Sequence, residues 1–250
     1  MLVVYAILFA LHLGLTIWFY VSGTNTETIN YIYNILITSF VLIPFFQGIL
    51  YNKKYPELKK IILPLQISNF LFAAALYIWF YYNITGNETP YPSLADLFFL
   101  LYYPINLASL YYLTRQTKIK WTISFIVSTF LVFVILAGIS TAFLSNQSIN
   151  FNSSPVVIIL NLIYPILDAL LVAFGLIILR SQRNFGYRYL FFYVFGYVFL
   201  GFADVIFAYQ TNAGIYWNGN IADLLYATAH MFIALGTYFL PTIAVKTEQS

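Results

Sequence analysis

The stretch TPYPSLADLFFLLYYP (residues 89–104) places one acid, Asp96, in a run that otherwise suits a lipid bilayer. Ser93 precedes Asp96 by three residues, which is the spacing of a capping box at the start of a helix. The stretch NGNIADLLYATAHMF (residues 218–232) has Asn220 three residues before Asp223 in the same way. An acid in the first turn also suits the positive end of the helix dipole. We therefore interpret Ser93, Asp96 and Asn220 as helix-capping residues.

The two stretches belong to an internal repeat. A shift of 127 residues aligns Ala95-Asp96-Leu97 with Ala222-Asp223-Leu224. The same shift also pairs Asn34 with Asn161, Phe72 with Phe199, Tyr82 with Tyr209 and Tyr111 with Tyr238. We predict two tandem units, residues 1–118 and 119–250, in one integral membrane domain. Each unit holds four predicted spans, and since four is even, both units have the same orientation.

Composition places the chain among membrane proteins. It is 62% hydrophobic and 8% charged, whereas about a quarter of a soluble domain is charged. A spanning helix needs about 20 mostly apolar residues. We predict an all-α polytopic fold with eight such segments, at residues 2–22, 29–51, 61–82, 94–114, 120–144, 155–179, 187–209 and 221–244. The absence of cysteine excludes disulfides and thiolate metal sites.

The basic residues predict the orientation of the chain. All eleven Lys and Arg residues lie in 52–60, 115–120, 180–188 and the tail from Lys246. The connections between these segments hold none. Positive-inside bias then predicts a cell-membrane protein whose basic loops and both termini are cytoplasmic. We expect a lipid bilayer as its surroundings and no nucleic acid as a partner.

Two acids lie deeper in the predicted spans. Asp168 falls in the middle of the sixth and Asp204 near the outer end of the seventh. A carboxylate at such depth either marks a functional site or is a protonated acid bonded to a tyrosine or a backbone carbonyl as a packing contact. His230 lies two helical turns after Asp223 on the same face. We predict a ligand site in the outer half of the second repeat, lined by Asp168, Asp204, Tyr209, Asp223 and His230.

The repeat singles out part of this set. Asp168, Asp204 and His230 align with Val41, Tyr77 and Tyr103 of the first unit. The polar group is therefore predicted for the second unit alone, as expected of a duplicated scaffold that specialised one half for binding.

The segments PYPSLADLFFLLYYP and GFADVIFAYQTNAGIYWNGNIADLLYATAHMFIALG resemble the multi-span N-terminal sensor regions of prokaryotic signalling proteins. Those regions precede diguanylate cyclase, phosphodiesterase or histidine kinase domains. The sequence here ends at Ser250, so a stand-alone module without an output domain is expected. The resemblance implies sensing of a ligand or of the membrane state, with a cytoplasmic or membrane signalling partner. It supplies no ligand and no catalytic residues.

Three functions are therefore considered. The first is a ligand-binding or sensory module, and the 21% aromatic content favours a hydrophobic or aromatic small ligand. The second is a small proton-coupled transporter, and the third is an intramembrane metal-dependent lipid-modifying enzyme. Catalysis is less favoured, because the spacing H-E-x-x-H is missing and no metal site is predicted. The cofactor is unknown, but covalent retinal is excluded because it requires an intramembrane lysine.

Overall fold

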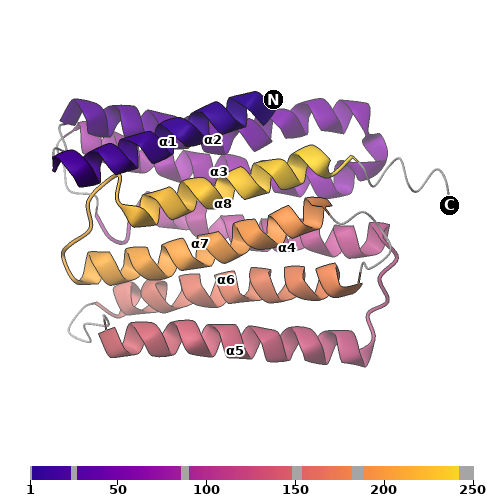
Figure 1. Cartoon of the computed structure of the whole chain (residues 1–250). Helices are drawn as coiled ribbons and strands as arrows, with labels where there is room; N and C mark the ends of the chain where they lie inside the picture. The colour runs from indigo at the N-terminus through magenta and orange to yellow at the C-terminus, as the bar shows by residue number, and fades with distance from the viewer. Residues whose placement is uncertain (1, 24–26, 86–89, 148–153, 182–187, 242–250) are drawn as a thin grey trace.

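The computed structural model describes residues 2–23, 27–85, 90–147, 154–181 and 188–241. These residues form an all-helical bundle without strands (Figure 1). The helices are α1 (Leu2–Ser22), α2 (Glu27–Lys54), the short 3-10 turn η1 (Pro56–Leu58), α3 (Lys59–Ile84), α4 (Leu94–Gln116), α5 (Ile123–Gln147), α6 (Pro155–Ser181), α7 (Arg188–Asn212) and α8 (Ile221–Phe239). The predicted spans and these helices agree to within a few residues at most ends.

Seven of these helices, α1 to α7, are long and apolar enough to cross a membrane. Large apolar side chains such as Val21, Ile123 and Phe130 are exposed on the outside of the bundle. Contiguous exposed apolar surface is costly in water and suits a lipid environment. The chain is therefore a multi-pass membrane protein. Helix α8 is 19 residues long and carries Asp223 and His230. It is not among the seven helices that are apolar enough to cross a membrane, so an eighth span stays a prediction.

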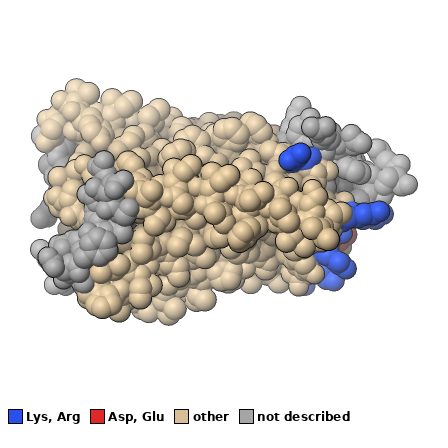
Figure 2. Space-filling view, turned by 90° about the horizontal axis from the view of Figure 1, so that it is seen from below, with Lys and Arg blue, Asp and Glu red and all other residues tan. Residues whose placement is uncertain are grey.

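The basic residues gather at one end of the bundle. Figure 2 shows Lys and Arg at that end, while the long flank in view carries no charged side chain among the residues it describes. This end, called the basic end below, carries Lys53, Lys54, Lys59, Lys60, Arg115 and Lys118. Arg183 and Lys246 lie outside the described residues.

Successive helices run in alternating directions along the bundle (Figure 1). Helices α2, α3 and α4 pack side by side, and so do α6, α7 and α8. Helix α1 lies against α2 and α8, whereas α5 lies against α6 and α7. Three contacts join the predicted units: α2 with α8, α1 with α8, and α4 with α6. The shift of 127 residues exchanges the α2–α8 contact with the α4–α6 contact, whereas it would pair the α1–α8 contact with α4 and α5, which do not pack extensively.

Helix bounds also follow the repeat. The shift takes Glu27–Lys54 onto positions 154–181, where α6 spans Pro155–Ser181. It takes Lys59–Ile84 onto positions 186–211, where α7 spans Arg188–Asn212. These two pairs of helices thus coincide to within two residues at the predicted spacing, and the duplication itself stays a prediction.

Two caps fix the helix starts at the end opposite the basic end. The Ser93 hydroxyl accepts a hydrogen bond from the Ala95 N–H at 3.2 Å, and the Ser93 N–H donates to Asp96 Oδ2 at 2.6 Å. Asn220 Oδ1 accepts from the Ala222 N–H at 2.7 Å. These are the contacts that the sequence predicts for Ser93, Asp96 and Asn220. They hold the first turns of α4 and α8 rigid, and both turns face a pocket.

Candidate functional site

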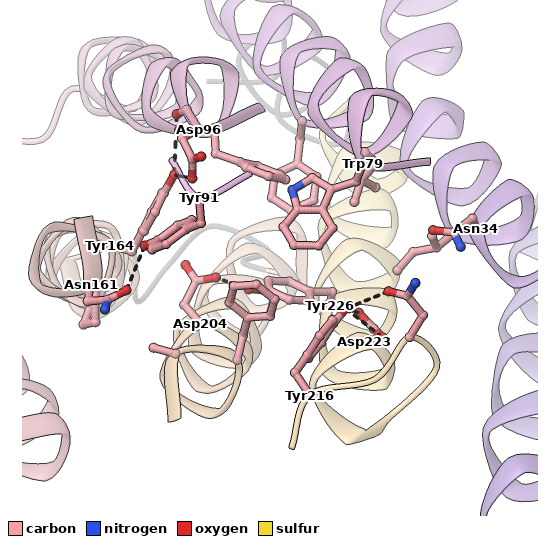
Figure 3. A pocket seen from close by; sticks show the side chains of 18 of the residues that line it. Asn34, Trp79, Tyr91, Asp96, Asn161, Tyr164, Asp204, Tyr216, Asp223 and Tyr226 are labelled. Carbon is pink, nitrogen blue, oxygen red and sulfur yellow. Dashed lines mark hydrogen bonds between the residues drawn. The ribbon is translucent and has the colours of Figure 1, made fainter. Parts of the chain in front are cut away.

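A cavity of about 90 Å³ lies in the half of the bundle away from the basic end (Figure 3). One water molecule needs roughly 10–15 Å³ of such space, so the cavity has room for a small ligand. Its walls come from α2, α3, α4, α6, α7, α8 and the loop before α8. Three carboxylates line it, from Asp96, Asp204 and Asp223, and no Lys or Arg is among the described lining residues.

Asp96 serves the cap and the pocket with different oxygens. Its Oδ2 accepts from the Ser93 backbone, while its Oδ1 accepts from the Tyr164 hydroxyl of α6 at 2.9 Å. Tyr91, in the loop before α4, donates to Asn161 Oδ1 at 2.7 Å. Burial, together with Asp96 and Asp204 nearby, raises the pKa of Tyr91 above its usual value. Its phenol therefore stays protonated and remains a donor at neutral pH.

Asp223 repeats this arrangement on the other side. Its Oδ2 accepts from the Gly219 N–H at 2.6 Å, and its Oδ1 accepts from the Tyr216 hydroxyl at 3.1 Å. Gly219 has φ +92, and a Cβ there would lie 2.4 Å from Phe19 Cε2, so only glycine fits. Burial and the Asp223 carboxylate raise the pKa of Tyr216 well above its usual value. Asp223 is thus held in place by neutral donors.

Asp204 is held by two phenols from two other helices. Tyr226 of α8 donates to its Oδ1. The Tyr103 oxygen of α4 lies 2.8 Å from its Oδ2 and 3.1 Å from Oδ1 of Asp168 on α6. Asp168 is 3% exposed and does not line the cavity itself. Tyr103 therefore bridges one pocket carboxyl group and one that is buried behind the pocket wall.

Aromatic rings form most of the remaining wall. Phe72 and Trp79 come from α3, Phe99 from α4 and Phe207 from α7. Several of them contact one another: ring centroids are 4.9 Å apart for Phe72 and Phe99, and 5.8 Å apart for Trp79 and Phe207. Carboxylates and rings thus share one enclosed space.

Ten of the twenty lining residues are paired by the repeat. The shift of 127 residues connects Asn34 with Asn161, Ile37 with Tyr164, Tyr91 with Asn218, Asp96 with Asp223 and Phe99 with Tyr226. The pocket therefore takes corresponding positions from both predicted units.

The structure brings together part of the predicted set. Asp204 and Asp223 line the pocket, and Asp168 lies behind Tyr103. Tyr209 is not among the lining residues. His230 is fully buried below the pocket, with its ring 4.3 Å from that of Phe72 and with both ring nitrogens lacking hydrogen-bond partners among the described residues. His230 is thus away from the three carboxylates.

Sequence reasoning missed two kinds of contributor. Asp96 was assigned to capping alone, although its match with Asp223 was a signal that both acids face one site. Tyr103 was noted only as the counterpart of His230, and nothing in its apolar surroundings marks it as the partner of two acids. In the described part of the chain, no three His, Cys, Asp or Glu residues are grouped as a metal site would require.

Comparisons with known proteins return no relatives. No protein-family model matches the chain, and no curated protein or solved structure matches it significantly.

Proposed function

We propose that this protein is a membrane-embedded binding module for a small organic cation, and that it acts as a sensory module. The observation that carries the proposal is the pocket itself: three carboxylates and a wall of aromatic rings, without a described basic residue to neutralise them. A ligand that enters this space meets carboxylates, ring faces and neutral polar groups, and no described basic side chain.

Two physical effects favour a cation in such a space. Charge attraction is much stronger in a low-dielectric interior than in water. Aromatic faces attract cations through their quadrupole, by about 0.5–2 kcal/mol for each suitable contact. An anionic ligand would meet repulsion from the same three acids, and a neutral one would gain from burial alone.

The lining also offers polar groups that a ligand can use. Tyr33 of α2 is 2% exposed, lines the pocket and has a hydroxyl without a hydrogen-bond partner among the described residues. A buried hydroxyl left in that state costs free energy. A ligand or an ordered water that bonds to it recovers that cost.

The position of the pocket supports a sensory role. It lies in the half of the bundle opposite the basic end. With α8 as an eighth span, positive-inside bias places both termini and the basic end in the cytoplasm. The half of the bundle that holds the pocket then faces the outside. A cation from outside would then bind between the two units, where a change in the α2–α8 and α4–α6 contacts can reach the cytoplasmic loops.

Calorimetry on the purified protein in lipid nanodiscs tests the proposal. Tetramethylammonium and benzylammonium are expected to bind, and neutral benzyl alcohol is expected to bind at least about tenfold more weakly, which is about 1.4 kcal/mol. Asp204→Asn keeps the side-chain shape but removes one charge. It is therefore expected to weaken the binding of both cations by a similar factor.

The matched control is Glu57→Gln, which removes an exposed carboxylate at the basic end and should leave the affinity unchanged. Size-exclusion chromatography and thermal unfolding establish that each variant is folded. The proposal fails if neither cation binds, if benzyl alcohol binds as tightly as benzylammonium, or if folded Asp204→Asn binds as the unchanged protein does.

A further inference from the structure

The contacts of the Tyr103 hydroxyl indicate that one of two neighbouring acids carries a proton. The hydroxyl oxygen is 3.1 Å from Asp168 Oδ1 and 2.8 Å from Asp204 Oδ2, both within hydrogen-bond distance. A phenol has one proton and can make a well-directed hydrogen bond to only one of them. The other contact would set two lone pairs against each other unless that carboxyl group is protonated and donates to the phenol oxygen. At least one of the two acids therefore carries a proton.

The remaining contacts indicate which acid carries it. Tyr226 donates to Asp204 Oδ1, so Asp204 accepts from two phenols when Tyr103 donates to it as well. Asp168 has no donor besides Tyr103 among the described residues, and its carboxyl group also lies within hydrogen-bonding reach of the Asp204 carboxyl group. An uncompensated buried charge costs far more than an uncompensated neutral oxygen. The ionised state thus suits Asp204 and the protonated state suits Asp168.

The packing encloses Asp168. A Cβ built on Gly201 of α7 would lie 3.2 Å from Asp168 Cβ, so the α7 backbone closes directly over this residue. Asp168 is 3% exposed, whereas Asp204 lines the pocket. Besides the direct contact between the two carboxyl groups, Tyr103 gives a proton on Asp168 a path to the pocket: Asp168 gives its proton to the phenol oxygen while the phenol gives its own to Asp204.

We propose that Asp168, Tyr103 and Asp204 form a proton-binding site, in which one proton resides on Asp168 and exchanges with the pocket through Tyr103. The site requires no ligand. Its link to ligand binding rests on the proposed function: a cation beside Asp204 favours negative charge on the acid pair and so opposes the proton. By linkage, the proton must oppose the cation by the same factor.

Other titratable groups surround the acid pair from every side. Tyr102 of α4, Tyr164 of α6, Tyr226 of α8 and Tyr91 are phenols, which do not ionise near neutral pH. Asp96 and Asp223 line the same pocket, and buried His230 packs on Phe72. A change in pH alone therefore does not identify the acid pair, and the test compares variants at one position.

Infrared difference spectroscopy on the purified full chain, without any ligand, tests the proton directly. At neutral pH the unchanged protein is expected to show the carbonyl stretch of a protonated carboxyl group. Asp168→Asn, whose amide can still donate to the Tyr103 oxygen, is expected to lose that band. Asp204→Asn and the control Glu57→Gln are expected to keep it. A band that survives in folded Asp168→Asn, or no band in the unchanged protein, overturns the proposal.

Tyr103→Phe supplies the answer if Asp168→Asn does not fold. Removing the phenol oxygen deprives the Asp168 proton of its acceptor, so the band is expected to shift in frequency. An unshifted band in Tyr103→Phe overturns the proposal.

The link to the pocket is tested with tetramethylammonium, whose charge does not depend on pH. Its affinity is expected to rise with pH, by up to about tenfold per pH unit where one proton is released. Asp168→Asn is expected to make the tetramethylammonium affinity depend less on pH, even though Asp96 and Asp223 are still present. An infrared band without tetramethylammonium binding retains the proton site and rejects the proposed function. Tetramethylammonium binding without the infrared band retains the proposed function and rejects the proton site.

Discussion

Tyr103 shows how one side chain joins the two halves of the molecule. It belongs to the first unit, yet its hydroxyl contacts only acids of the second, Asp168 and Asp204. The repeat counterpart of Tyr103 is His230, which packs on Phe72 and bonds to no described side chain. Corresponding positions therefore took different roles: the phenol bridges two carboxyl groups, and the imidazole fills space.

Replacement of His230 tests this division. Both of its ring nitrogens are buried without partners, so an apolar side chain of similar size removes a cost and breaks no bond. His230→Leu is expected to leave tetramethylammonium affinity unchanged and to keep or raise the melting temperature, with a stability change within about 1 kcal/mol. Calorimetry measures the tetramethylammonium affinity, and thermal unfolding measures the melting temperature. Lost affinity at unchanged stability would show that His230 belongs to the binding site.

The acids show what residue-level reasoning can predict. Asp204 and Asp223 could be placed near a common site because both lie toward the same ends of helices that follow each other in sequence. Asp96 was set aside because its cap explained it. A carboxylate has two oxygens, however, and one can cap the helix while the other accepts from Tyr164 across the pocket.

At the scale of helices, α7 and α8 approach each other most closely at two glycines. A Cβ on Gly196 would lie 2.7 Å from Ile233 Cγ1 and 3.0 Å from the Ala229 carbonyl oxygen. A Cβ on Gly236 would lie 3.0 Å from the Tyr189 carbonyl oxygen. Small residues allow such contacts between membrane helices. This approach holds Tyr226 of α8 beside Asp204 of α7.

Gly196→Ala is therefore expected to separate α7 from α8. The backbone of Ala229 cannot rotate away as a side chain can, so overpacking should cost about 1–3 kcal/mol. A lowered melting temperature and weaker tetramethylammonium binding are expected together. Gly138→Ala in α5 is the matched control, because a Cβ there meets nothing within 4 Å. Equal melting temperatures for the two variants would contradict the close contact.

The positions of the helices were predictable, but their neighbours were not. Long apolar runs define α1 to α7 directly, because lipid imposes both length and composition. The same lipid removes the contrast between a helix face that packs and one that does not. Helix α5 is among the most apolar spans, yet only 6% of its apolar stretch is buried inside the bundle. Hydropathy therefore could not reveal that α1 and α5 lie at the periphery.

For the whole molecule, the pocket takes lining residues from both predicted units and not from the second one alone. Comparing the repeats drew attention to positions where they differ, such as Asp168 and His230. A site between two similar units is built largely from positions where they correspond, such as Asn34 with Asn161 and Asp96 with Asp223. The sequence thus predicts a spacing of 127 residues between corresponding positions, but it does not predict the contacts that bring these positions around one space.

The separation of the pocket from the basic end leads to a prediction about orientation. The chain has no cysteine, so a single introduced thiol reports its own accessibility. Ala213 is exposed at the pocket end and Lys118 is exposed at the basic end. If the basic end is cytoplasmic, a membrane-impermeant maleimide added to intact cells should label Ala213→Cys. Lys118→Cys should react only after the cells are opened. The opposite pattern would place the pocket on the cytoplasmic side, where it could not sense an external cation.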